Sequence, residues 1–262
     1  MLMKKIISAL FAVLVVFVSL NSASAQEEPV SPDRPDQTES PNVIPLNSFQ
    51  VEAGIVFEKD VDEGLTSKNL SYPTVLLRYG LLNNFELRLA VQNVKSTLEF
   101  DGASSSISGL APLSLGFKMN VCDEKGLRPS AGFEINFTLP NLASKEFKND
   151  FVGTSILLAL ENSITDKFSA GYNLGASWDG NSPEPTFGYS LSLSYQLTKR
   201  FSGFAEVYGF MPEKTKADHR LDFGLSYLAL NNLMFDTSAG VGITDNAPDF
   251  FVSGGLSFRL PK

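Results

Sequence analysis

The chain has 262 residues, of which 43% are apolar and 19% are charged, with 21 Lys and Arg against 29 Asp and Glu. This composition excludes a mainly disordered protein, and the acidic balance argues against a nucleic-acid partner. One Cys and one His exclude a disulfide framework and a Cys-based metal centre, so we expect neither a cofactor nor a metal. The 21 Phe and 20 Gly residues suit many short strands and tight turns, which indicates an all-β protein.

The first 25 residues have the pattern of an export signal. A short basic start, Met1 to Lys5, precedes an almost wholly apolar run over residues 6–20, and small residues follow at Ala23-Ser24-Ala25. This run is too short to cross a bilayer comfortably as a helix, and no later apolar run is long enough. We expect residues 1–25 to be a signal peptide, cleaved between Ala25 and Gln26, of a protein exported in a Gram-negative bacterium.

Residues 26–46 form a charged segment, with five prolines, that we expect to be a periplasmic arm. The prolines prevent a helix or a central strand, because each removes an N–H donor and fixes its own φ. A solvated linker and an arm that docks into or beneath the next domain both fit this composition. The docking interpretation depends on the motif Asp33, Arg34, Pro35, Asp36, Gln37, Thr38 and Glu39.

Residues 47–262 repeatedly alternate apolar with polar or small residues, which is the pattern of strands with two different faces. The alternation is blurred by the apolar run at 156–160, and the facing of 202–211 is ambiguous. Twelve strands are predicted, near residues 49–57, 74–79, 85–92, 113–121, 130–139, 154–164, 168–178, 187–197, 202–211, 220–227, 233–243 and 250–260.

The connections between these strands alternate in length. Short turns are predicted at 82–84, 122–127, 165–167, 198–200 and 230–232. Longer loops are predicted at 59–69, 95–109, 140–150, 179–185, 212–218 and 244–248. An even number of strands of about 10 residues, with short turns at one end and longer loops at the other, predicts an antiparallel transmembrane β-barrel of the outer-membrane type.

A soluble β-sandwich or barrel would show the same alternation, with its apolar face packed inside. The composition of the two faces separates these possibilities. The polar face is rich in Ser, Gly and Asn, while the apolar face is large and rich in Phe, as a small polar lumen and a lipid-facing wall require. We therefore expect residues 47–262 to form a barrel in the bacterial outer membrane.

Several sequence blocks resemble a known bacterial outer-membrane family. They are Asp33 to Pro41, Phe49-Gln50-Val51-Glu52, Leu77-Arg78-Tyr79-Gly80, Glu86-Leu87-Arg88, Leu113 to Lys118 and Arg128-Pro129. Together they resemble the family of the meta-pathway phenol-degradation type, often called simply "transporter". The resemblance implies an outer-membrane β-barrel with a transport role and supplies no catalytic residues.

Charged residues fall at inward positions of the predicted strands. A Lys or Arg facing lipid at mid-depth would cost roughly 2 to 4 kcal/mol, so these residues fix the register. They are either a salt-bridge network that fills the lumen or a charged lining that selects solutes. The candidates are Glu52, Arg78, Glu86, Arg88, Lys118, Glu134, Glu161, Glu206, Arg220, Asp222, Asp236 and Arg259.

Three functions remain open at this point. We expect a narrow channel for small solutes, with the arm at its periplasmic mouth, and the alternative is a non-conducting structural or surface-interaction barrel. A lipid-modifying enzyme would need a Ser close to His219, and Ser226 lies too far along the same strand, so no enzyme activity is expected. The expected partners are outer-membrane lipid, the barrel assembly machinery and an unknown small solute.

Overall fold

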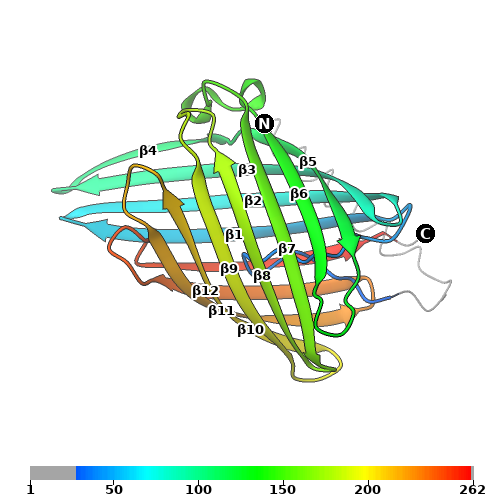
Figure 1. Ribbon diagram of the computed structural model, residues 1–262. Helices are drawn as coiled ribbons and strands as arrows, with labels where there is room; N and C mark the ends of the chain where they lie inside the picture. Colours follow the sequence, from blue (N-terminus) through cyan, green and yellow to red (C-terminus); the bar gives the residue numbers. More distant parts are fainter. Residues whose placement is uncertain (1–27, 261–262) are drawn as a thin grey trace.

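The computed structural model describes residues 28–260, so the predicted signal peptide and its cleavage site lie outside the described residues. Within this range every strand belongs to one antiparallel sheet (Figure 1). Its strands are β1 (Phe49–Asp62), β2 (Leu65–Leu82), β3 (Phe85–Phe100), β4 (Ala103–Leu110), β5 (Leu113–Cys122), β6 (Ser130–Leu139), β7 (Gly153–Thr165), β8 (Phe168–Trp178), β9 (Thr186–Gln196), β10 (Phe201–Pro212), β11 (Asp218–Leu230), β12 (Leu233–Gly242) and β13 (Phe250–Arg259).

The sheet closes on itself. Successive strands pair with each other except β4 and β5, and β13 pairs with β1. Strands β4 and β5 both pair with β3, one with each half, so together they occupy one position in the ring. The predicted closed antiparallel barrel with twelve strand positions is therefore confirmed. Closure leaves no free edge in the barrel wall, which is what lipid requires of a β-structure.

Strand alternation divides the side chains between the two surfaces of the wall. Outward residues such as Leu174 and Phe223 are more than half exposed, while inward residues such as Asp222 are fully buried. Strand β10, whose facing is ambiguous in sequence, follows the same rule, since Glu206 and Tyr208 are buried. Large apolar side chains on the outside and buried charges on the inside are the arrangement of a membrane barrel.

The expectation of a long loop is wrong at two places. Residues 59–69 and 95–109 are instead β-hairpins that extend β1 with β2 and β3 with β4 beyond the other strands (Figure 1). The Lys68 and Glu99 side chains pair at 2.7 Å on the outer surface of this extension. Alternation along β3 puts Leu98 and Phe100 on the inner surface. Polarity on β3 is thus reversed beyond the barrel wall, which hides the strand pattern in this part of the sequence.

The remaining long connections are loops, as expected. The connection from β6 to β7 contains two short 3-10 helices, η1 (Pro140–Leu142) and η2 (Lys145–Phe147). Ser144 between them closes over the end of β4, because its Oγ accepts a hydrogen bond from the Leu110 N–H at 2.8 Å. No helix among the described residues is long and apolar enough to cross a membrane.

A lipid-facing arginine tests which part of the sheet lies in the membrane. Leu174→Arg, in the middle of β8, should lower the free energy of unfolding by about 2–4 kcal/mol, because the charge would face hydrocarbon. The matched variant Val61→Arg lies on the hairpin extension and should cost less than about 1 kcal/mol. Urea unfolding from lipid vesicles measures both. Equal costs for the two variants would contradict a membrane that surrounds the middle of β8 and not the hairpin extension.

Candidate functional site in the barrel lumen

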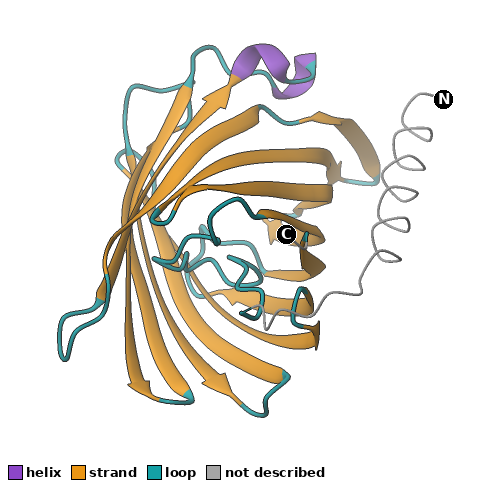
Figure 2. Ribbon diagram, turned by 90° about the vertical axis from the view of Figure 1, so that its right-hand side faces the viewer, coloured by secondary structure: helices purple, strands orange, loops and turns teal. Residues whose placement is uncertain are grey.

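The segment of residues 28–47 lies inside the barrel, and we call it the arm. It is the loop within the ring of strands in Figure 2. The Val30 N–H donates to the Asn231 carbonyl oxygen at 2.6 Å, and the Asn47 N–H donates to the Gly80 carbonyl oxygen at 2.8 Å. Both contacts are at the short-turn end of the barrel. The arm therefore enters the lumen and leaves it at the same end.

The arm does not lie at the mouth of the barrel, and it is not a solvated linker. Thr38, at its deepest part, is 6% exposed and contacts residues in the middle of β9 and β10. The expectation of a linker fails because charged side chains inside the barrel bind the polar residues of this segment. Proline content alone does not distinguish a solvated segment from one that is bound by side chains.

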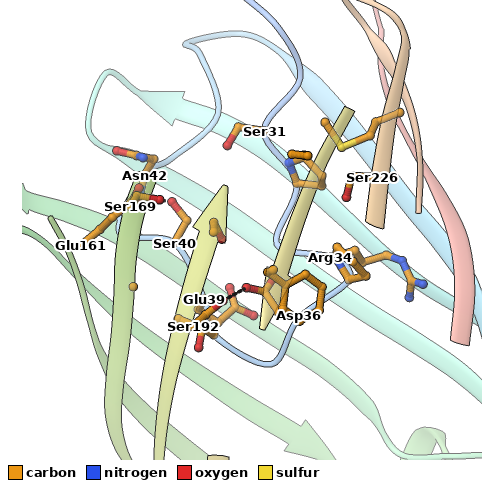
Figure 3. Close-up of a pocket in the computed structure, with 18 of the residues that line it drawn as sticks. Ser31, Arg34, Asp36, Glu39, Ser40, Asn42, Glu161, Ser169, Ser192 and Ser226 are labelled. Carbon is orange, nitrogen blue, oxygen red and sulfur yellow. Dashed lines mark hydrogen bonds between the residues drawn. The ribbon is translucent and has the colours of Figure 1, made fainter. Parts of the chain in front are cut away.

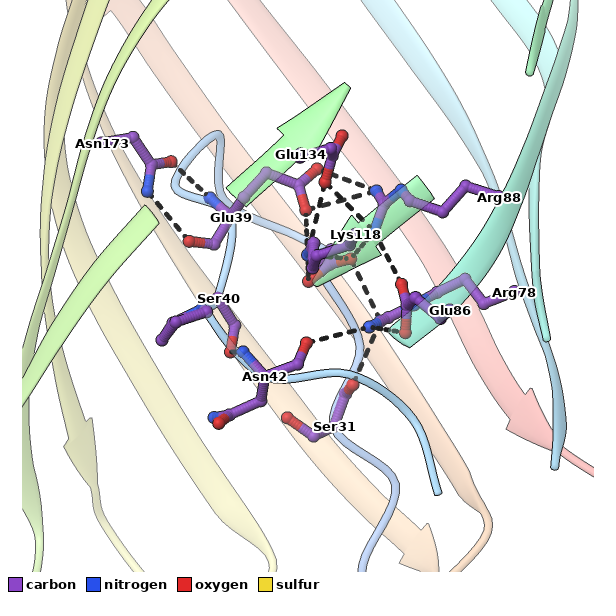
Figure 4. Close-up of polar contacts among 12 residues, drawn as sticks. Ser31, Glu39, Ser40, Asn42, Arg78, Glu86, Arg88, Lys118, Glu134 and Asn173 are labelled. Atoms are coloured by element: carbon purple, nitrogen blue, oxygen red, sulfur yellow. Dashed lines mark hydrogen bonds and ion pairs between the residues drawn. The ribbon is translucent and has the colours of Figure 1, made fainter. Parts of the chain in front are cut away.

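Asp33 of the arm lies among three cations of the wall. Figure 4 shows these cations, Arg78, Arg88 and Lys118. The Asp33 carboxylate is 2.9 Å from Lys118 Nζ and 3.1 Å from Arg78 Nη1, and it also pairs with Arg88. These side chains come from β2, β3 and β5. Burial alone would raise the pKa of Asp33, but Arg78, Lys118 and Arg88 together hold it well below its usual range.

Glu39, a second arm carboxylate, binds two of the same cations. It pairs with Lys118 Nζ at 2.7 Å and with Arg88 Nη2 at 3.2 Å. The wall adds its own carboxylates, because Arg78 pairs with Glu52 at 2.9 Å and with Glu86 at 2.8 Å. Each cation on this side of the lumen therefore has more than one carboxylate partner, as buried charges require.

Wall side chains also satisfy the backbone of the arm. Four arm N–H groups donate to side-chain oxygens of inward residues, because the backbone of the wall is already paired in the sheet. The donors and acceptors are Asp33 to Glu52 at 3.1 Å, Gln37 to Glu206 at 2.8 Å, Glu39 to Asn173 at 2.7 Å and Ile44 to Glu86 at 2.8 Å. The lumen is thus shaped to hold this chain segment.

Two glycines of the wall make room for Arg34 of the arm. A Cβ on Gly54 or Gly255 would lie within 2.6 Å of the guanidinium group. The guanidinium pairs with Asp236 of β12 at 2.9 Å. Any larger residue at either glycine would displace it, so these two positions are set by the close approach of the arm.

On the other side of the lumen, carboxylates gather without cations. Glu206 of β10 and Asp222 of β11 are direct cross-strand partners, and both are buried. Neither carboxylate oxygen of Asp222 has a hydrogen-bond partner among the described residues. Burial and the neighbouring Glu206 raise the pKa of Asp36 of the arm to about 8. The two sides of the lumen therefore differ strongly in charge balance.

A cavity of about 280 Å³ lies beside the arm on this acidic side (Figure 3). Its wall comes from β7 to β12 and is rich in hydroxyl groups, which include Ser169, Ser192 and Ser226. Ser192 also donates to the Asp36 carboxylate at 2.9 Å. Two carboxyl groups, Asp36 and Glu161, line the cavity without an ion-pair partner in the described part of the chain.

The predicted lumen residues lie as follows. All twelve are on the strands of the barrel, and ten of them are buried: Glu52, Arg78, Glu86, Arg88, Lys118, Glu134, Glu206, Asp222, Asp236 and Arg259. Glu161 lines the cavity. Arg220 lies toward the long-loop end, where it pairs with Glu58 at 2.7 Å. Their contribution to a solute path is a proposal, taken up below.

Sequence reasoning missed the uncharged residues that hold the arm. Asn173 binds both the N–H and the carbonyl of Glu39, and Ser190 and Ser192 accept from or donate to Thr38 and Asp36. All three occupy inward positions of regular strands. Their inward position could have been predicted from strand alternation. Ser and Asn are also common in solvent-filled barrels, however, so these residues do not indicate a bound segment.

His219 lies at the start of β11. Its Nδ1 is 3.0 Å from the Tyr189 hydroxyl, and its backbone N–H donates to Thr244 Oγ1 at 3.0 Å. Within residues 28–260, no group of His, Cys, Asp and Glu has the arrangement of a metal centre.

An apolar outer wall around a charged lumen defines this protein as a β-barrel of the outer-membrane type. The family model described as "Putative MetA-pathway of phenol degradation" matches residues 32–260. The chain therefore belongs to this family, and the resemblance noted in its sequence is confirmed. The matched range begins within the arm, so it includes residues 32–47 of the arm.

Known structures share the fold at low sequence identity. The COG4313 outer membrane channel from Pseudomonas putida F1 is 11% identical, with a TM-score of 0.66 over 91% of this chain and 100% of that chain. The NanC porin is also 11% identical, with a TM-score of 0.51 over 80% of this chain and 98% of that chain. The translocator domain of the autotransporter NalP from Neisseria meningitidis is 14% identical, with a TM-score of 0.53 over 80% of this chain and 88% of that chain. No curated protein matches this chain in sequence.

Replacing Asp33 tests whether it anchors the arm. Asp33→Ala should destabilise the protein by about 1.5–3 kcal/mol, because it removes a carboxylate bonded to three buried cations, which keep Glu52, Glu86 and Glu134 as partners. It should also make the arm accessible to protease while the barrel remains resistant. The matched variant Gln37→Ala should change neither property, since Gln37 binds the wall through its backbone. An arm that stays protected in Asp33→Ala would contradict the anchoring role.

Proposed function

We propose that this protein is an outer-membrane channel for small solutes whose lumen is closed by its own N-terminal arm. The observation that carries the proposal is the arm itself, which occupies the lumen of a closed barrel and is held there through polar contacts. In the orientation that outer-membrane barrels adopt, the short turns and both ends of the arm face the periplasm, and the long hairpins face the cell exterior. The wall contacts outer-membrane lipid, after insertion by the barrel assembly machinery.

The charge balance of the wall supports an arm that can leave. Without the arm, Arg78, Arg88 and Lys118 retain Glu52, Glu86 and Glu134 as neighbours, the same number of carboxylates as cations. The wall is therefore neutral on this side even when Asp33 and Glu39 move away. If the wall needed the arm to neutralise its charges, departure of the arm would leave unpaired buried charges, which is costly.

Polar contacts also suit a reversible plug better than apolar packing does. Each hydrogen bond that the arm makes to a charged wall residue can be exchanged for one to water, so its net contribution is about 1.5–3 kcal/mol. An arm held by apolar side chains would have to expose them when the lumen fills with water. The arm can thus be displaced at a cost that a transport protein could meet. The solute is small, because twelve strands enclose a narrow lumen.

A disulfide between arm and wall tests the opening directly. The Thr38 and Ser190 side-chain oxygens are 2.7 Å apart, so cysteines at these two positions can form the bond. In a Cys122→Ser background, the oxidised Thr38→Cys/Ser190→Cys protein should stay at low conductance in a planar bilayer, and a reductant should restore the larger openings of the parent. Equal conductance in both redox states would contradict a mobile arm.

Deletion of the arm tests whether it closes the lumen. A protein without residues 26–40 should show a larger and steadier single-channel conductance than the intact protein, because Asp33, Thr38 and Glu39 no longer fill the lumen. Heat-modifiable migration on a gel verifies that the shortened barrel is folded. A folded but silent deletion variant would contradict the channel and favour the non-conducting barrel.

A further inference from the structure

The outer surface of the barrel wall carries an apolar groove across β8 to β13. Its volume is about 730 Å³, which lies within the range of about 300–1,000 Å³ of small-molecule sites. Large exposed side chains of β9 and β11 form its two rims. They are Leu193 and Tyr195 on β9 and Phe223 and Leu225 on β11. The groove therefore opens toward the hydrocarbon of the membrane.

Small residues form the floor of this groove. Gly203 of β10 lies between its cross-strand partners Tyr195 and Leu225, and Ala205 lies between the next residues of the same two rims. A Cβ on Gly203 would lie 3.0 Å from Leu225 Cδ2, so the rim closes tightly over this position. Ala239 of β12 continues the floor beyond β11. The groove thus follows β10 from the short-turn end toward the middle of the wall.

Three cations lie where the groove reaches the short-turn end. Lys199 and Arg200 form the turn between β9 and β10, and Lys167 directly precedes β8. The Lys167 carbonyl oxygen accepts the Gln196 N–H at 2.8 Å, which places the two turns side by side. The three cationic side chains are exposed, and within residues 28–260 no ion pair joins them to a carboxylate. Asp166 is the one anion in these two turns.

The charge of this end is unusual for the chain. Among the short turns of the described barrel, only the turn of Lys199 and Arg200 has a net positive charge, in a chain with a net charge of -8. Directly after this turn, Phe201 packs against Tyr227 with ring centroids 4.6 Å apart. Aromatic side chains at strand ends mark the level of the lipid headgroups. The cations are therefore placed to meet a phosphate group of the membrane.

We propose that this groove binds an anionic phospholipid of the periplasmic leaflet. One acyl chain lies on Gly203 and Ala205, and the phosphate group contacts Lys199, Arg200 and Lys167. The surrounding lipid is as apolar as the groove, so the chain contributes packing rather than a hydrophobic driving force, and the cations supply the preference for a negative headgroup. The inference uses the orientation proposed above and does not depend on conduction through the lumen.

A tryptophan in the groove can report which lipid occupies it. In full-length Tyr195→Trp/Trp178→Phe, the new side chain lies on the rim, and the single Trp of the sequence is removed from the other end of the barrel. The protein is refolded into vesicles of phosphatidylethanolamine and phosphatidylglycerol, with brominated acyl chains on one lipid or the other to quench the fluorescence. The expected preference for phosphatidylglycerol is about tenfold or more, since each nearby cation contributes about fivefold.

A second reporter separates a site from general attraction to the membrane. Leu87→Trp/Trp178→Phe places the tryptophan on the outer face of β3, also near the short-turn end but beside a turn without charges. Its ratio of quenching by the two lipids should be close to one. An equal preference at both reporters would overturn the inference.

Charge and shape are then removed separately in the groove reporter. Lys199→Gln/Arg200→Gln should bring the ratio close to one, whereas Lys125→Gln/Arg128→Gln removes two cations from the turn between β5 and β6 and should leave it unchanged. Ala205→Phe fills the floor and should lower the ratio with every cation in place. Gel migration with and without heating identifies folded protein. A ratio near one in the groove reporter itself, or a preference that survives the loss of Lys199 and Arg200 or the filling of the floor, overturns the site and leaves the proposed channel untouched.

Discussion

The need to neutralise buried charge inside the barrel governs the rest of this structure. Arg78, Arg88 and Lys118 must point inward, because lipid on the other face of their strands would be far more costly for them. Once inside, they require carboxylate partners at close range. The wall supplies some of these, and Asp33 of the arm supplies the carboxylate that contacts all three cations. The register of the strands and the position of the arm therefore follow from the same requirement.

The barrel could be predicted from sequence, because alternation along a strand is a local property. Strands β8 and β9 alternate without error, and their inward and outward faces are as expected. The hairpin extension could not be predicted, since beyond the barrel wall Lys68 and Glu99 face outward while Leu98 faces inward. The strands continue with the same backbone alternation, but outside the membrane their polar side chains face outward. A rule that assigns apolar residues to the outer face therefore fails there.

The arrangement of the site was predictable only in part. Inward charges such as Arg88 and Glu206 follow from strand parity, but their partners depend on which strands become neighbours and on where the arm lies. Asp33 joins Lys118 across 85 residues of sequence, and Thr38 joins Glu206 across 168. No local pattern encodes such pairs. The excess of carboxyl groups on one side of the lumen likewise appears only after the arm has taken its place beside the other side.

Proline explains why the arm is a plug rather than an additional strand. With Pro29, Pro32, Pro35, Pro41 and Pro45, the segment cannot present a continuous row of N–H donors. The wall has no row of unpaired backbone N–H and C=O groups either, because these groups pair with each other in the closed sheet. The remaining N–H groups of the arm must therefore find side chains, and Glu52, Glu86, Asn173 and Glu206 meet that need. A segment held in this way adds nothing to the ladder of the sheet, so it can move without opening the barrel.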